Sequence, residues 1–213
     1  MDILPDIVLQ YAERFSSPED ELLQEVHAFT VANHPKAHMI SGKVQGKFLK
    51  MISCMIRPRR VLEIGTFTGY SALCLAKGLA IDGELHTLEL RETDAQTALG
   101  FFNRSPYRQQ IKLHIGDAME KLGELEEEWD LVFIDADKTR YLAYLTEILP
   151  KVRVNGFIFV DNTLFHGQVL EPEIKGKNAR AIQAFNEQLQ QVPGIEYVLL
   201  PLRDGLTMIR KVA

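Results

Sequence analysis

Oxygen-bearing side chains follow two short apolar runs in the second half of the chain. The run Leu131–Ile134 ends at Asp135, and the run Phe157–Val160 ends at Asp161 and Asn162. If these runs are neighbouring parallel strands, their carboxyl ends meet at one edge of a sheet, where ligands bind. Carboxylate and amide oxygens are the ligands that Mg²⁺ and Mn²⁺ prefer. Either segment alone is more often a turn or a helix cap, but together they predict a divalent cation site.

Lys138 lies one helical turn after Asp135. Beside a divalent cation and removed from water, an ammonium group loses its proton more easily. We therefore predict that Lys138 has a lowered pKa and acts as a general base. The alternative is an exposed helix lysine without a chemical role.

A glycine-containing turn follows the earlier run Val61–Ile64. Gly65 and Gly69 allow a tight passage from strand to helix and the close approach of a ligand. The turn lacks the GxGxxG pattern, because Phe67 occupies the second glycine position, and it lacks GxxxxGK[ST]. This bulky side chain disfavours a dinucleotide whose pyrophosphate crosses the turn. Glu63 places a carboxylate where a cationic amine can pair with it, although such a turn can also serve geometry alone.

Two further acidic residues follow the next two apolar runs. Glu89 stands twenty residues after Gly69, where a carboxylate can accept the two hydroxyl groups of a ribose. Asp117 follows Gly116, where it can accept a hydrogen bond from an adenine amino group. Each residue also has a structural interpretation, Glu89 as a solvated charge at a strand end and Asp117 as a helix N-cap. The sequence leaves both interpretations open.

These residues need a sheet to hold them side by side. Five apolar runs, separated by segments long enough for crossover helices, predict repeated βαβ units around a parallel sheet. The runs are Val61–Ile64, Leu85–Leu88, Ile111–Ile115, Leu131–Ile134 and Phe157–Val160.

The two ends of the chain differ from this pattern. A helix near residues 178–191 precedes the runs Tyr197–Leu200 and Leu206–Ile209, and the turn signal Arg203-Asp204-Gly205 between them predicts an antiparallel hairpin. The N-terminal part has helical periodicity, with helices expected near residues 7–15, from Ser17-Pro18 with Pro18 near the first position, and over 44–56. We predict one domain over residues 1–213, with an N-terminal helical cap (1–58) and a core (59–213).

Composition excludes several classes of protein. The 213 residues include 24 Lys and Arg against 29 Asp and Glu, for a net charge of −5, and this acidic balance disfavours nucleic acid as a partner. No apolar run has the length of a membrane span, and Met1 to Pro5 lack the features of a signal peptide. Cys54 and Cys74 form no disulfide or zinc pattern, so we expect two buried free thiols in a reducing cytoplasm. The six histidines show no zinc-binding spacing.

Four segments carry a family resemblance that extends from about residue 41 to the C-terminus. They are Val61–Ser71, Ile134–Lys138, Val160–Leu164 and Leu200–Leu206. In order and spacing the chain resembles the cation-dependent O-methyltransferases of the caffeoyl-CoA and catechol type. The resemblance implies a Rossmann-like, doubly wound α/β fold with a mostly parallel seven-stranded sheet. It also implies S-adenosylmethionine as methyl donor and a divalent cation, Mg²⁺ or else Mn²⁺ or Ca²⁺, that binds vicinal hydroxyl groups.

The resemblance also implies roles for single residues. It assigns the methionine part of the donor to Glu63, Gly65, Thr66 and Ser71, and the ribose hydroxyls to Glu89. It assigns the adenine side to Asp117 and Ala118, and Met39 is expected to line the pocket. Asp135, Asp161 and Asn162 match the metal ligands, Asp135 also approaches the donor's amino group, and Lys138 matches the base.

The chain departs from the family pattern in three places. Val154-Asn155-Gly156 replaces the usual Gly-Gly before the fifth strand. Thr207 stands where catechol-specific members have a glutamate, so the chain is more similar to the caffeoyl-CoA branch. The first sixty residues, which shape the acceptor pocket, match weakly.

The sequence therefore predicts methyl transfer from S-adenosylmethionine to one hydroxyl of a vicinal dihydroxy aromatic small molecule, in the cytoplasm and without a membrane partner. A homodimer through the apolar N-terminal helices, with Phe48, Leu49 and Ile52, is expected. Two alternatives remain: a nicotinamide-dependent oxidoreductase, and a non-catalytic nucleoside-binding protein on the same fold.

Overall fold

Seven strands form one sheet in the computed structural model of the chain, which describes residues 5–213. The strand order is β3-β2-β1-β4-β5-β7-β6; β1 to β5 pair in parallel, and β7 runs antiparallel to both of its neighbours. The predicted mostly parallel sheet with an antiparallel C-terminal hairpin is confirmed. The strands are β1 (Arg60–Ile64), β2 (Glu84–Glu89), β3 (Ile111–Ile115), β4 (Trp129–Ile134), β5 (Val152–Asp161), β6 (Ile195–Leu200) and β7 (Leu206–Lys211).

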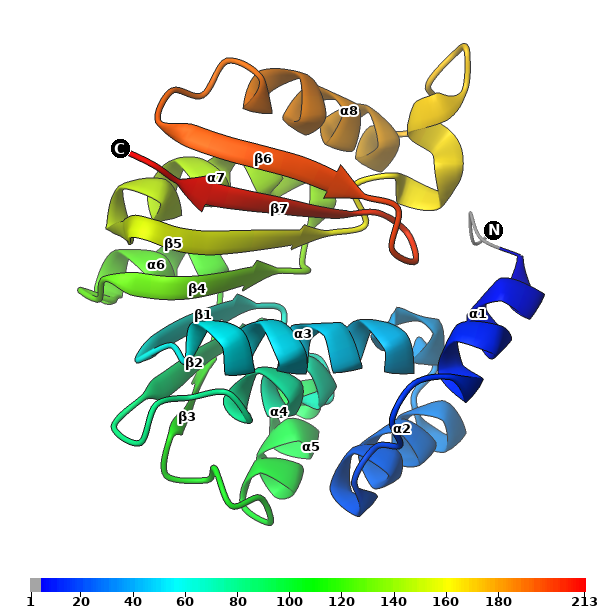
Figure 1. Ribbon diagram of the computed structural model, residues 1–213, viewed down its shortest axis with the longest axis vertical. Helices are drawn as coiled ribbons and strands as arrows, with labels where there is room; N and C mark the ends of the chain where they lie inside the picture. The colour runs from blue at the N-terminus through cyan, green and yellow to red at the C-terminus, as the bar shows by residue number, and fades with distance from the viewer. Residues whose placement is uncertain (1–4) are drawn as a thin grey trace.

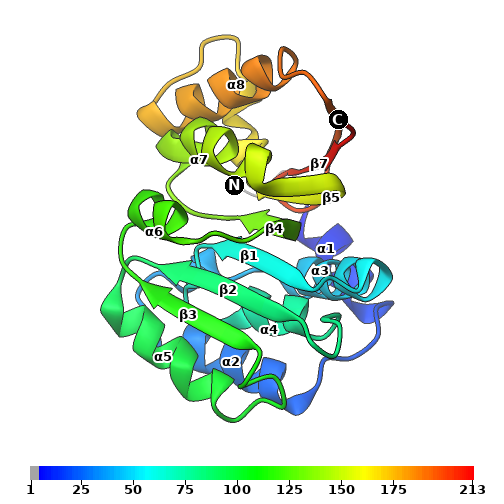
Figure 2. The ribbon, with the colours of Figure 1, turned by 90° about the vertical axis from the view of Figure 1, so that its left-hand side faces the viewer.

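Helices cover both faces of this sheet (Figure 2). Successive residues of a strand face opposite sides, so a covered parallel strand needs apolar residues on both. Val61 of β1 packs in the core on one face, whereas Leu62 and Ile64 pack in the core on the other. The first face is covered by α2 (Glu21–Asn33), α3 (Lys43–Ile56), α4 (Tyr70–Ala76) and α5 (Glu92–Phe102), and the second by α6 (Ala118–Glu124), α7 (Tyr141–Ile148) and α8 (Lys177–Leu189).

Shorter elements complete the described chain. Helix α1 (Asp6–Arg14) buries none of its residues, and its apolar side chains Ile7 and Tyr11 are exposed. The short 3₁₀ helices are η1 (Ala37–Met39), η2 (Lys138–Arg140), η3 (Leu149–Lys151) and η4 (Phe165–Leu170). No helix within residues 5–213 is long and apolar enough to cross a membrane. The signal-peptide expectation depends on Met1 to Leu4, which lie outside the described residues.

Two element boundaries differ from the prediction. Helix α2 begins at Glu21, and its N-cap is Asp20, whose carboxylate accepts from the backbone N–H of Leu23 at 3.2 Å. Pro18 therefore lies outside the helix, before the N-cap. Asp20 takes the N-cap position because its carboxylate can accept from the free N–H groups of the first turn, whereas a proline side chain has no acceptor. Strand β5 begins at Val152, five residues earlier than predicted, because residues 153–156 bulge out of the pairing with β4.

The predicted burial of the two cysteines is partly wrong. Cys74 is buried, as expected, but Cys54 is exposed. On α3, which packs against α4, Leu49 is fully buried, whereas Phe48 and Ile52 are half-buried at the edge of the same core. The homodimer through these helices stays a prediction. The domain division at residue 58 stays a prediction.

The carboxyl ends of β4 and β5 and the β6–β7 turn lie on the side of the molecule that also carries α1 and α2 (Figure 1). The turn is bonded directly to the residues after β5: the backbone N–H of Thr163 donates to Gly205 O at 3.0 Å, and that of Leu164 donates to Asp204 O at 2.9 Å. A segment from the C-terminus is thereby fixed beside the residues with predicted chemistry.

Candidate active site

Glu63 is a fully buried carboxylic acid near the end of β1. Burial raises its pKa to about 8, although the hydroxyl groups of Thr87 and Ser71 oppose the shift. Thr87 Oγ1 donates to Glu63 Oε2 at 2.5 Å, whereas Oε1 has no hydrogen-bond partner among residues 5–213. A buried, unpartnered acceptor costs stability, so this oxygen is suited to a cationic ligand group.

The turn after β1 is tightly packed against β4. Gly65 has a φ of 101°, and a Cβ atom there would lie 2.0 Å from the carbonyl oxygen of Asp135. The backbone N–H groups of Gly65 and Thr66 both donate to Leu88 O, at 3.0 and 3.2 Å. Only glycine fits this approach, which brings the predicted donor loop directly beside the first predicted metal ligand.

Glu89 closes this turn from β2. Its two carboxylate oxygens accept from the backbone N–H groups of Phe67 at 2.7 Å and of Arg91 at 2.9 Å. The Phe67 ring is fixed between His34, at 4.5 Å between ring centroids, and the Arg91 guanidinium, 5.7 Å away. Glu89 is therefore a buried and oriented carboxylate, and its interpretation as a merely solvated charge is wrong.

Asp117 and Ala118 lie where β3 leads into α6. Asp117 is the N-cap, and it accepts from the backbone N–H of Met119 at 2.9 Å; Ala118 is the first residue of the helix. The second Asp117 oxygen accepts from Arg140 Nη1 at 2.6 Å. Burial would raise the pKa of Asp117, but these hydrogen bonds outweigh it and lower the pKa. The structural interpretation of Asp117 is thus confirmed, and adenine binding stays a prediction.

Lys138 forms a charged pair at the start of η2. Its Nζ donates to Asp135 Oδ1 and to the Tyr141 hydroxyl, each at 2.7 Å. Burial favours the neutral amine, but Asp135, Tyr141 and Asp161 outweigh it, so the pKa of Lys138 is raised. The carboxylates that could hold a cation thus stabilise the ammonium ion. The predicted lowering concerns Lys138 beside a bound divalent cation and stays a prediction.

Asp161 is fully buried at the end of β5. Burial and the neighbouring charge of Asp135 raise its pKa to about 6. Its Oδ1 accepts from the backbone N–H of Asn162 at 2.8 Å, and its Oδ2 has no partner in the part of the chain that the structure describes. The protein therefore buries a carboxylate oxygen beside a second carboxylate, and Lys138, Gln45 and Arg203 offset the resulting rise in pKa only in part. A bound cation would stabilise the ionised form.

Asn162 follows directly in the left-handed conformation, with a φ of 59°. Its Nδ2 donates to Asp204 Oδ2 at 3.2 Å, which leaves the amide oxygen available as an acceptor. The buried Thr207 hydroxyl donates to Thr163 Oγ1 at 2.9 Å, on the residue that follows Asn162. Asp135, Asp161 and Asn162 thus supply oxygen atoms at one sheet edge and fit a hard divalent cation. Within residues 5–213, no group of three or more His, Cys, Asp and Glu side chains forms a metal cluster.

Three side chains at this edge were missed by the sequence analysis. Tyr141 is buried, and its hydroxyl donates to the carbonyl oxygen of Asp161 at 3.0 Å. Gln45 of α3 is buried beside Asp161, and its Oε1 lies 3.5 Å from Arg203 Nη1. Arg203 also reaches the carbonyl oxygen of His38 at 3.3 Å. Arg203 and Gln45 are 158 residues apart, so no local pattern could indicate their meeting.

Met39, predicted to line the donor pocket, lies at the end of η1 and remains 40% exposed. It adjoins His38, which Arg203 contacts, so this segment borders the β6–β7 turn. The structure brings Glu63, Gly65, Asp135 and Lys138 together, and it places the Met39 segment beside the β6–β7 turn. The roles of the individual residues stay predictions.

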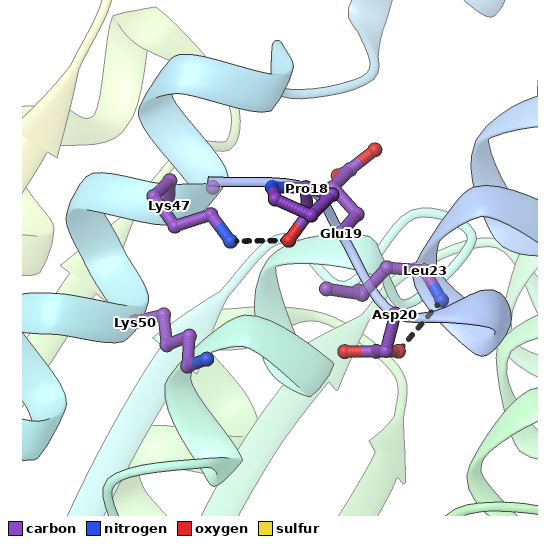
Figure 3. A pocket seen from close by; sticks show the side chains of 7 residues that line it. Pro18, Glu19, Asp20, Leu23, Lys47 and Lys50 are labelled. Atoms are coloured by element: carbon purple, nitrogen blue, oxygen red, sulfur yellow. Dashed lines mark hydrogen bonds between the residues drawn. The ribbon is translucent and has the colours of Figure 1, made fainter. Parts of the chain in front are cut away.

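A cavity of about 250 Å³ lies apart from these residues, between α3 and the segment Pro18–Asp20 (Figure 3). Lys47 Nζ donates across it to the carbonyl oxygen of Pro18 at 2.9 Å. The same segment bonds α4 and its C-terminal end, through Glu19 with Tyr70 and Asp20 with Lys77. None of the predicted site residues lines this cavity; it belongs to the polar attachment of the N-terminal segment.

Comparison with solved structures defines the class of protein. An SAH-bound methyltransferase from Podospora anserina superimposes with a TM-score of 0.91 and 31% identity, covering 99% of each chain. An O-methyltransferase from Bacillus cereus in complex with SAH gives a TM-score of 0.89 and 30% identity, with 96% of this chain and 97% of that chain covered. The fold is that of the Rossmann-like methyltransferases.

Sequence relatives define the family. The model of the O-methyltransferase family matches residues 13–212. Caffeoyl-CoA O-methyltransferase 1 from Eucalyptus globulus is 32% identical over 206 residues, covering 92% of this chain and 83% of the relative. Caffeoyl-CoA O-methyltransferase 5 from Nicotiana tabacum is also 32% identical, with 91% and 85% covered. The chain belongs to this family and is an S-adenosylmethionine-dependent O-methyltransferase.

Proposed function

We propose that this enzyme methylates one hydroxyl of a vicinal dihydroxy aromatic and that it uses a divalent cation held by Asp135, Asp161 and Asn162. The observation that carries the proposal is the buried, unpartnered Oδ2 of Asp161 beside a second carboxylate. Structural residues seldom leave a carboxylate in this state, because the desolvation cost is not offset. A metal-binding carboxylate needs an accessible lone pair in this position.

The donor binds on the β1–β3 half of the edge in this proposal. Glu63 Oε1 pairs with the donor's ammonium group, which requires that Glu63 lose the proton that burial retains up to about pH 8. The Glu89 carboxylate is already oriented by two backbone N–H groups and has lone pairs left for ribose hydroxyls. Asp117 and Ala118 lie after the end of β3, where the adenine of the donor would bind.

On the β4–β5 half, Lys138 supplies fixed positive charge. Its Nζ donates to Asp135 and Tyr141, which fix its position, and the Asp135 carboxylate favours the ammonium form. An ammonium ion beside the acceptor oxygen favours its ionised form and so assists the attack on the methyl group. When bound, the cation would chelate both acceptor oxygens and lower the pKa of the one that reacts. The remaining task of the protein is positioning.

The proposal is tested by turnover with purified protein, labelled S-adenosylmethionine, Mg²⁺ and a panel of catechols and flavonoids. We expect a methyl ether product that requires Mg²⁺ and disappears with EDTA. The exposed Glu126 provides a matched control, since Glu126→Gln removes one surface carboxylate and should leave activity unchanged. Donor binding without turnover on any acceptor in the panel would refute the proposed substrate class.

Neither alternative is favoured by an observation. A nicotinamide dinucleotide would need its pyrophosphate at the turn where the Phe67 ring is fixed. A nucleoside-binding scaffold has no use for the buried Asp161 oxygen and its charged neighbours. Calorimetric titration with NADH and with S-adenosylmethionine separates these cases, and we expect binding of the latter only.

Assembly and location stay predictions. We expect a homodimer through the N-terminal helices, to which the half-buried Phe48 and Ile52 can still contribute, whereas Leu49 is buried in the core. Light scattering at micromolar concentration tests it, and a monomer mass would contradict it. We also expect the enzyme to act in the cytoplasm, which cell fractionation tests.

A further inference from the structure

The guanidinium group of Arg203 lies at the candidate active site and forms no hydrogen bond to a charged group in the described part of the chain. Its Nη1 is 3.5 Å from Gln45 Oε1, and its Nη2 is 3.3 Å from the carbonyl oxygen of His38. Both acceptors are neutral, and both distances exceed the usual length of about 2.9 Å. Within residues 5–213 this group forms no ion pair with a carboxylate, although its charge favours the ionised form of the nearby Asp161. Since a guanidinium has five N–H donors, most of its bonding capacity is unused.

The position of Arg203 is fixed by the β6–β7 turn. Its neighbour Asp204 accepts from Asn162 Nδ2 at 3.2 Å, so the turn is bonded directly to a predicted metal ligand. On the other side, the Arg203 side chain reaches α3 and η1 through Gln45 and His38. Arg203 therefore spans from the metal edge to the N-terminal segment.

The backbone at this residue is strained. Arg203 has a φ of 53°, in the left-handed region that glycine and asparagine adopt at lower cost. The side chain is half-buried. A strained backbone that presents a partly desolvated cation at a binding edge is typical of a residue retained for recognition.

We propose that Arg203 binds a carboxylate carried by the methyl acceptor, so that the acceptor is a vicinal dihydroxy aromatic acid. This inference rests on the proposed function of the site. The planar guanidinium pairs with a carboxylate through two parallel N–H···O bonds, which are stronger than bonds to neutral oxygens. Such a pair would hold the acid end of the acceptor at Arg203 and direct its ring toward Asp135 and Asp161.

The experiment compares an acid with its own neutral ester. Wild type, Arg203→Met and Arg203→Lys are assayed for kcat/KM with caffeic acid and with methyl caffeate. We expect wild type to prefer the acid. Arg203→Met should lower kcat/KM for the acid at least tenfold and for the ester less than twofold, because only the acid loses a charged pair. Arg203→Lys should have a kcat/KM for the acid between those of wild type and Arg203→Met, because lysine keeps the charge but cannot form the two parallel hydrogen bonds of a guanidinium.

Arg108→Met is the matched control. Arg108 is exposed before the amino end of β3, at the end of the sheet opposite the site. The substitution Arg108→Met therefore removes the same charge as Arg203→Met without touching the acceptor. In Arg108→Met, the ratio of kcat/KM for the acid to kcat/KM for the ester should equal that of wild type. SAH affinity and melting temperature confirm that each variant is folded.

Two outcomes would overturn the inference. Equal losses for acid and ester in Arg203→Met would mean that Arg203 only attaches the N-terminal segment. A preference for caffeoyl-CoA over the free acid, dependent on Arg203, would assign the residue to phosphate recognition. Equilibrium binding of the acid and the ester to the SAH complex separates this inference from the proposed function. Arg203-dependent binding of the acid without any methylation would refute the proposed function alone.

Discussion

The two halves of the sheet edge hold their acidic residues in different ways. On the β1–β3 half, Glu89 and Asp117 accept from backbone N–H groups of nearby turns. On the β4–β5 half, Asp135 is bonded to the Lys138 ammonium, and Asp161 lies next to a second carboxylate. Each half retains one fully buried carboxylate with an unpartnered oxygen, namely Glu63 in the first and Asp161 in the second.

This difference indicates which charge each half requires from a ligand. In the first half, Glu89 is held by backbone N–H groups and Asp117 by a backbone N–H and Arg140, so the half needs only one cationic group from the donor, at Glu63. The second half concentrates negative charge that Lys138 compensates only in part, so it needs a cation of higher charge. The comparison predicts that charge-changing substitutions have larger effects in the second half than in the first.

Asp161→Ala should have the largest effect. We expect kcat/KM to fall on the order of 10³-fold, because the site loses a cation ligand and with it the acidification of the acceptor hydroxyl. Binding of Mn²⁺, measured by electron paramagnetic resonance, should be lost, while SAH affinity changes less than about twofold in calorimetry, since Glu63 and Glu89 lie on other strands. Unchanged Mn²⁺ binding would show that this edge is not the metal site.

Lys138→Ala should lower kcat by about 10²-fold with little change in SAH affinity, because its charge acts on the ionised acceptor. If Lys138 acts through its positive charge, as proposed, Lys138→Arg should recover part of the loss. The defect should shrink at high pH, where the acceptor ionises unaided. A rate profile over pH for all three proteins measures this, and a complete absence of rescue by arginine would favour the general-base role instead.

Glu63→Gln should weaken SAH binding by about tenfold or more, because a buried charge pair loses one partner. It should also change the pH dependence of stability. The unfolded chain releases this proton near its ordinary pKa of 4.5, and the folded protein near 8. The contribution of Glu63 to stability is therefore fully present below pH 4.5 and is lost as pH rises through 8.

Melting temperatures of the ligand-free protein between pH 6 and 8.5 measure this second effect. Wild type should lose stability over that interval relative to Glu63→Gln, which cannot ionise. Above pH 6 the contribution of Asp161, whose pKa is about 6, is largely complete and does not mask the difference. Parallel curves for the two proteins would contradict the raised pKa of Glu63.

Asp117→Asn should have the smallest effect. Asparagine preserves the N-cap of α6, and the Arg140 partner is at the surface, where ion pairs contribute little. We expect SAH affinity to fall by about threefold and kcat to remain unchanged, as calorimetry and initial rates would show. A loss comparable to that of Glu63→Gln would mean that the two halves do not differ as described.

Much of the fold follows from local patterns. The core of every strand was placed from short apolar runs, because a strand covered on both faces needs apolar side chains at successive positions. Glu63, Glu89, Asp135 and Asp161 were placed at strand ends for the same reason. The two boundaries that differ have local causes as well: β5 contains a bulge, and Asp20 is the N-cap of α2, so that Pro18 lies outside the helix.

Residue types and spacing by themselves determined the chemistry offered at the sheet edge: carboxylates near the ends of β1, β2, β4 and β5, and a lysine one turn after Asp135. Only the tertiary structure decided the state of these groups. The raised pKa of Lys138, the unpartnered oxygen of Asp161 and the meeting of Gln45 with Arg203 depend on burial and on segments distant in sequence. The physical reason is that apolar periodicity is a property of neighbouring residues, whereas the electrostatic energy of a buried charge depends on everything packed around it.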